Sequence, residues 1–179
     1  PMFARESVLG EVRGAKLHSP LGFTLTLEAR SIRAYVVDRA HFDRVMFHKA
    51  VDAGAVPRLG SSARHIRDTG SEVHTDARTD HQSEELVSRV VIGADGYKSI
   101  CRKSSHLAAP KHMLTGIQVD LKGVDIDPEF VELFLGRDVA PGFFAWAIPA
   151  GDLVRVGLCT WDAADLPAVY LKRLLTRPQ

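Results

Sequence analysis

This 179-residue sequence has only two cysteines, no long apolar run and almost no net charge. Each of these absences excludes a class of protein. Cys101 and Cys159 lie far apart and neither has a CxxC neighbour, which excludes a disulfide framework or a zinc module and predicts two buried free thiols. No apolar stretch approaches the ~20 residues that a helix needs to cross a bilayer. The 23 basic and 22 acidic side chains give a formal charge of +1, so the net charge gives no reason to expect nucleic-acid binding.

What is present is the composition of an ordinary globular protein, with 45% hydrophobic and 25% charged residues. We expect one domain, or one domain and a piece of another. The sequence opens on Pro1-Met2-Phe3 and shows no basic segment followed by an apolar stretch. We therefore expect no signal peptide, a cytoplasmic protein, and ends that are cut from something longer.

Motifs for metal binding and for nucleophilic catalysis are missing as well. Among the eight histidines, His41 and His48 are two helical turns apart, or about 10 Å, which is too far for one metal ion to bridge. There is no HxxxH, HExxH or GxSxG motif. We therefore predict no metal site and assign no catalytic residue from sequence.

The pattern of apolar residues predicts an α+β protein with few helices and a mixed, largely antiparallel β-sheet. A strand over residues 34–37 leads into a helix over 40–53, with Asp38 as its N-cap. Further strands are expected at residues 23–27, 62–67, 72–78, 86–92, 113–121, 130–135, 143–148 and 153–160. A second helix is expected over 166–175, and residues 112–160 are expected to form one contiguous antiparallel sheet.

Two short segments are candidates for ligand contact. Gly93-Ala94-Asp95-Gly96 follows an apolar run, and its glycines allow a ligand to approach the backbone, although a turn containing Asp-Gly explains the segment equally well. Arg39 opens a helix whose N-terminal end is already positive, so its partner is either a phosphate or carboxylate or a neighbouring aspartate such as Asp43.

Together with these segments, three longer runs carry a resemblance to a known family. The runs are YVVDRAHFD at residues 35–43, VIGADGYKS at 91–99 and APGFFAWAIP at 140–149. The sequence resembles the geranylgeranyl reductase family of FAD-dependent oxidoreductases, within the p-hydroxybenzoate-hydroxylase-like superfamily. The first two runs are shared by the wider superfamily. The third is specific to the reductases, with Phe144 here for the usual Tyr and Ile148 for the usual Phe.

The resemblance implies an interior fragment, with residues 1–110 forming part of an FAD-binding domain and 111–179 a truncated substrate-binding domain. It implies flavin contacts by Arg39, Asp95 and Gly96, and a prenyl pocket formed by Phe144, Trp146 and Pro149. The GxGxxG turn that holds the FAD pyrophosphate in this family does not occur in the sequence, so we expect the chain alone to bind FAD poorly and to be inactive.

The activity implied is reduction of isoprenoid double bonds in a prenyl lipid or pigment, with NAD(P)H or ferredoxin as electron donor. A lipid substrate leaves peripheral contact with a membrane open. Period-two alternation would put Phe144, Trp146 and Ile148 on one face of their strand, where they line either a hydrocarbon cavity or the core. A flavin-dependent hydroxylase or monooxygenase and a non-catalytic lipid-binding module remain as alternatives.

Overall fold

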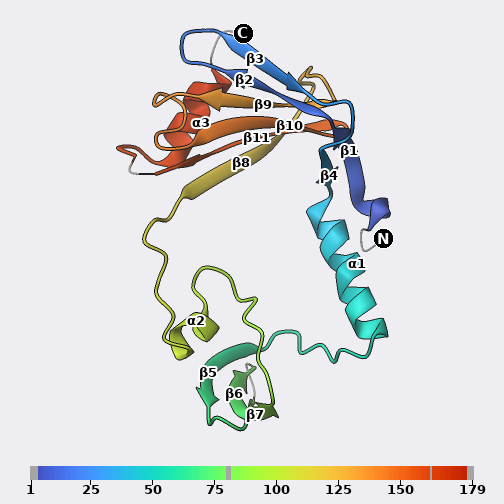
Figure 1. Ribbon diagram of the computed structural model, residues 1–179, viewed down its shortest axis with the longest axis vertical. Helices are drawn as coiled ribbons and strands as arrows, with labels where there is room; N and C mark the ends of the chain where they lie inside the picture. Colours follow the sequence, from blue (N-terminus) through green and yellow to red (C-terminus); the bar gives the residue numbers. More distant parts are fainter. Residues whose placement is uncertain (1–3, 80–81, 162, 177–179) are drawn as a thin grey trace. The chain divides into compact units, whose positions relative to one another are not determined.

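A computed structural model describes residues 4–79, 82–161 and 163–176 (Figure 1). The chain divides into two compact units. The first contains the residues up to Ala53 together with those from His112 onward, and the second is Gly54–Lys111. The second unit ends at Lys111, one residue beyond the predicted division at residue 110, and the residues up to Ala53 belong to the same unit as those from His112 onward. The functional division into FAD and substrate domains stays a prediction.

The first unit is built on a six-stranded sheet in the order β3-β2-β9-β10-β11-β8. Its strands are β2 (Gly14–His18), β3 (Thr24–Glu28), β8 (Thr115–Lys122), β9 (Phe130–Leu135), β10 (Phe144–Ala150) and β11 (Leu153–Thr160). Neighbouring strands are antiparallel except β2 and β9, which are parallel. The predicted antiparallel sheet within 112–160 is confirmed, and β2 with β3 extends it.

One face of this sheet is covered by α3 (Pro167–Leu175), as Figure 1 shows. Tyr170, Leu171 and Leu174 of the helix pack against Ala145 and Leu158, which are both fully buried, and against other residues of the sheet. Pro167 occupies the first helical turn, where a missing N–H is tolerated. The core of the unit therefore lies between α3 and this face.

A smaller ladder leads to the helix that carries Arg39. It consists of β1 (Val8–Val12), which follows a short 3-10 turn, η1 (Arg5–Ser7), and of β4 (Ala34–Val37), which pairs with β1 antiparallel. Asp38 then caps α1 (Arg39–Asp52), its carboxylate accepting from the His41 N–H at 3.0 Å. This bond also lowers the pKa of Asp38. The predicted strand, cap and helix are confirmed.

The second unit is a three-stranded antiparallel meander with a short helix, α2 (Ile100–Ser104). Its strands are β5 (Ser62–Asp68), β6 (Val73–Arg78) and β7 (Ser83–Ser88). The expected strand over 86–92 is wrong in its bounds. The Thr79 N–H donates to the Gln82 carbonyl in the turn between β6 and β7, so the two strands pair from Arg78 and Ser83 onward. The pairing ends at Ser88 because β6 has only six residues. Val90 and Ile92 are left 73% and 86% exposed.

The α+β class with largely antiparallel sheets and few helices is confirmed. Both cysteines are unpaired, as predicted, but they are half-buried rather than buried. No helix among the described residues is long and apolar enough to span a bilayer.

Candidate functional site

Strand β10 presents two different faces, as its alternation predicted. Ala145 and Ala147 are buried in the core formed with α3, and Pro149 follows them as a buried residue on the same face. Phe144, Trp146 and Ile148 are half-buried on the opposite face. The structure therefore brings Phe144 and Trp146 together and places Pro149 on the other side of the strand. A residue three positions from Trp146 cannot share its face in a strand with period two.

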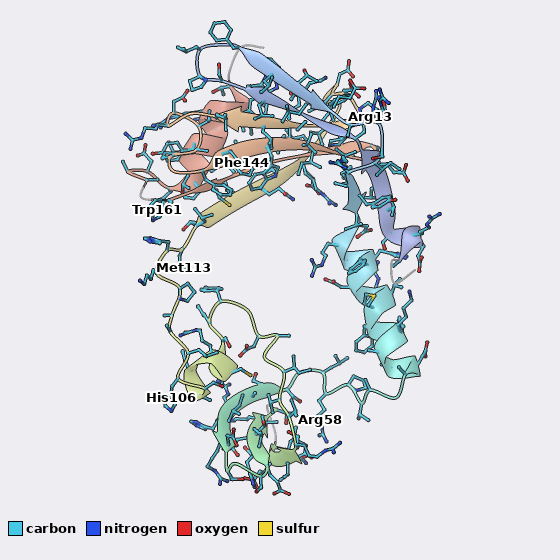
Figure 2. All side chains as sticks on the ribbon, viewed as in Figure 1. Arg13, Arg58, His106, Met113, Phe144 and Trp161 are labelled. Atoms are coloured by element: carbon cyan, nitrogen blue, oxygen red, sulfur yellow. The ribbon has the colours of Figure 1, made fainter. Side chains whose placement is uncertain are left out.

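The Trp146 ring lies over Gly157 of the neighbouring strand β11, in the space left by the missing side chain of that glycine. The ring is so close to Gly157 that a Cβ on that glycine would lie 2.7 Å from the Cε2 and Cζ2 atoms of the indole. Its Nε1–H donates to Gln118 Oε1 at 3.3 Å. The Phe144 ring, labelled in Figure 2, meets the indole edge-on with centroids 6.3 Å apart. Glycine within a strand is a signal of such a close approach, and sequence reasoning missed both Gly157 and Gln118.

The apolar surface continues from Trp146 across the sheet to its edge. Trp146 pairs with Leu133, Leu133 with Leu17, and Leu17 with Leu25 of the edge strand β3. Directly paired residues share a face of the sheet. The next row contains Val131, Ala15 and Leu27. We call this surface the Trp146 face; its residues are Phe144, Trp146, Ile148, Leu133, Val131, Leu17, Ala15, Leu25 and Leu27.

The Trp146 face is covered at one end and open at the other. At the Ile148 end, Ile148 and Val131 pack against Val12 of β1 and Val36 of β4. At the β3 end, Leu25 and Leu27 are 58% and 53% exposed. A contiguous apolar surface left open in this way marks a place where a ligand or another part of a protein binds.

Polar groups gather on the side of β11 and β8. Arg155 pairs across the strands with Ile148 and with Asp120, so it lies on the same side of the sheet. Its Nη1–H donates to the Val37 carbonyl at 2.8 Å, and its Nε lies 3.7 Å from Asp120 Oδ1. The arginine thus ties β11 to the residue that precedes the cap of α1.

Arg39 is exposed at the start of α1. Its side chain is 77% exposed, and its Nε–H donates to Asp43 Oδ1 at 2.8 Å, one helical turn further on. An exposed pair of this kind contributes little to stability. The guanidinium is therefore held lightly and remains accessible to a phosphate.

Asp95 and Gly96 belong to the second unit. Asp95 Oδ2 accepts from the Ile100 N–H at 2.6 Å and from the Cys101 N–H at 3.3 Å. A hydrogen bond with the Ser99 side chain, followed by these backbone bonds, lowers the pKa of Asp95. Asp95 thus shapes the loop before α2. The expectation that Asp95 directly follows a strand is wrong, because β7 ends at Ser88.

Gly96 has a backbone conformation that favours glycine, with φ of +70°. Apart from its two chain neighbours, no described residue has an atom within 4 Å of the position that a Cβ on Gly96 would take. The main chain at this turn can therefore be approached closely by a ligand, whereas the Asp95 carboxylate already accepts hydrogen bonds from backbone amides.

The second unit also contains a polar cavity of about 780 Å³ between β5 and α2. Arg67, Arg89 and His106 are among the residues that line it. None of the six site residues expected from sequence lines this cavity. Among residues 4–79, 82–161 and 163–176, no three His, Cys, Asp or Glu side chains are placed to hold a metal ion.

Comparison with known proteins gives consistent relationships. Residues 6–170 match the family described as FAD binding domain. The chain is 29% identical to a digeranylgeranylglycerophospholipid reductase of Methanocaldococcus jannaschii over 176 residues, which are 95% of this chain and 44% of the relative. It is 32% identical to another, from Methanococcoides burtonii, over 83% of this chain and 38% of the relative. The chain thus spans less than half the length of these curated relatives.

Two solved structures share the fold. A geranylgeranyl bacteriochlorophyll reductase-like protein from Thermoplasma acidophilum is 24% identical with a TM-score of 0.83, covering 95% of this chain and 46% of its own. A flavin-dependent brominase is 16% identical with a TM-score of 0.71, covering 87% and 41%. At these identities the likeness establishes the fold alone, and the two names describe different reactions.

Proposed function

The chain belongs to the FAD binding domain family, and from this premise we propose that it forms part of an FAD-dependent oxidoreductase that reduces isoprenoid double bonds. The substrate is a prenyl lipid or a prenylated pigment. Two of the relatives described above are named digeranylgeranylglycerophospholipid reductases, and the chain covers less than half of each. The activity therefore belongs to a protein that combines this chain with the remaining part of such a relative.

The observation that carries the proposal is the position of Trp146. The core side of β10 has the small side chains Ala145 and Ala147 followed by Pro149, whereas both aromatic rings lie on the opposite, half-buried face. Stability alone would place the largest apolar side chains in the core. Rigid rings on an open surface instead offer area to a hydrocarbon, with about 25 cal/mol gained for each Å² removed from water.

The flavin contacts are assigned to Arg39 and Gly96, with Asp95 shaping the loop that presents Gly96. Arg39 offers a lightly held guanidinium, which suits a phosphate of FAD, and Gly96 offers an open backbone. Bound in its reduced form, FAD would supply a hydride to one alkene carbon, and a proton from water would complete the saturation at the other. The residues of this chain bind and orient FAD and the prenyl substrate. The chain alone neither holds FAD tightly nor reduces the substrate.

Electrons reach the flavin from NAD(P)H or a ferredoxin in this proposal. The protein acts in the cytoplasm and touches the membrane only peripherally, because its lipid substrate lies there. The fold does not by itself select this reaction, since the brominase shares it. The apolar character of the Trp146 face favours a hydrocarbon over the small aromatic acid that a hydroxylase would take.

A hybrid enzyme tests the proposal. This chain would replace the matching segment of the Methanocaldococcus jannaschii reductase, and flavin absorbance would show whether the hybrid is loaded. We expect the loaded hybrid to reduce geranylgeranyl chains, seen in mass spectra as addition of two hydrogens per double bond. Failure to retain flavin would contradict the assigned contacts. A loaded hybrid that leaves the chains unreduced would contradict the activity, and oxygenated products would favour a monooxygenase.

A further inference from the structure

We propose that the prenyl chain lies across the strands, from Trp146 over Leu133 and Leu17 to Leu25, and that the edge strand β3 selects for long chains. This inference rests on the proposed function and adds to it the direction of the chain and the residues that measure its length. The row is given by the strand register.

The dimensions of the row suit a prenyl chain. Three strand spacings separate β10 from β3, which at about 4.8 Å each amount to about 14 Å. One extended isoprene unit is close to one strand spacing in length, so each unit beyond Trp146 meets the next residue of the row. The side chains from Trp146 to Leu25 are uncharged throughout, so the hydrocarbon desolvates no ion along this path.

The side chains of strand β3 indicate that the Trp146 face binds an apolar ligand. Its leucines, Leu25 and Leu27, both face the Trp146 side, whereas Thr24, Thr26 and Glu28 face the other. Edge strands in soluble proteins are normally protected by charged side chains. Here the apolar side chains on one face of the edge are more than half exposed and continue an unbroken apolar row, which is the surface that a hydrocarbon tail would cover.

The distribution of polar groups fixes the direction of the chain. On the same side of the sheet, Gln118, Asp120 and Arg155 lie toward β8 and β11. At the β3 end of the Trp146 face, the side chains of the strand are Leu25 and Leu27. An amphipathic lipid has one polar end and one apolar end, so it matches this surface in a single orientation, with its polar end toward β8 and its tail toward Leu25.

The test is a titration of this chain with geraniol, farnesol and geranylgeraniol, each one isoprene unit longer than the one before. In a Trp161→Phe background, tryptophan emission reports Trp146 alone. We expect geranylgeraniol to bind about tenfold more tightly than geraniol, because the longer tail buries more apolar area. Leu25→Glu should abolish this preference, weakening geranylgeraniol about tenfold and leaving geraniol within about twofold.

The matched control is Thr26→Glu, which adds the same charge to the next residue but on the other face. It should leave all three affinities unchanged. Binding without a length preference, or an equal effect of Leu25→Glu on all three alcohols, would overturn the inference and leave the proposed function standing. A dimer that Leu25→Glu dissociates, with no change in length preference, would assign the β3 leucines to self-association instead. Absence of binding by every alcohol would count against the proposed function as well.

Discussion

Gly157→Ala places one methyl group against the indole of Trp146. The added Cβ would lie 2.7 Å from two ring atoms and 2.8 Å from the Ile117 carbonyl oxygen. The carbonyl belongs to a paired strand and cannot move far, so the ring has to yield. We therefore expect the variant to tilt the Trp146 ring away from residue 157 and to break its hydrogen bond to Gln118.

The size of the effect follows from the crowding. Overpacking of this kind costs about 1–3 kcal/mol, and alanine in a strand recovers only about 0.5–1 kcal/mol relative to glycine. A net loss of about 1 kcal/mol lowers the Tm of a chain of this size by about 2–4 °C. Thermal melting measures the loss, and a red shift of the Trp146 emission in the Trp161→Phe background reports the displaced ring.

Gly10→Ala is the matched control, because a Cβ there would lie 3.8 Å from its nearest neighbour, which is ordinary contact. It should leave the Tm unchanged or raise it slightly. Adding Trp146→Ala to Gly157→Ala should remove the clash with the ring, so that the two changes together cost less than their sum. If Gly157→Ala melts like the parent and its emission is unchanged, the close contact between Gly157 and Trp146 is refuted.

Two further predictions concern the expected flavin contacts. Asp95→Asn should destabilise the second unit at neutral pH. A folded-state pKa held below 3.8, chiefly by Ser99, stabilises the fold above that value, and this contribution is lost as the pH falls through the lowered pKa. The loss of stability in Asp95→Asn, measured by thermal melting, should therefore be full at neutral pH and shrink as the pH falls below 3.8, and a difference that stays constant with pH would contradict this. Arg39→Glu should weaken flavin retention by the hybrid about tenfold without changing its Tm, because the side chain is exposed. Arg44→Glu on the same helix should do neither, and equal effects of both would refute the contact.

The features that could be predicted from sequence are those that depend on neighbouring residues. The two faces of β10 follow from period-two alternation, and α1 follows from helical spacing together with a capping aspartate at its start. Both patterns are complete within a short window. Alternation predicts that Ala145 and Trp146 lie on opposite faces, which their burial confirms, but it does not decide which of the two faces belongs to the core.

The features that could not be predicted depend on distant partners. Residues 14–18 carry no strong strand signal and pair in parallel with β9, more than a hundred residues later. The end of β7 is set by the length of β6, not by the apolar run that continues to Ile92. Gln118 and Gly157 come to Trp146 only through the register of three strands. The motif groups Pro149 with Trp146, although period-two alternation alone places the two residues on opposite faces.

The most direct test of the central claim, that the Trp146 face binds the prenyl chain, is to compare turnover and stability of the hybrid after Trp146→Ala. Loss of the contact between an aromatic ring and substrate, about 1.5–3 kcal/mol, predicts turnover of a geranylgeranyl substrate lowered about tenfold to a hundredfold. The Tm should change little, because the ring stands outside the core that α3 covers. A variant that loses several kcal/mol of stability yet turns over normally when folded would assign Trp146 to packing and contradict the account.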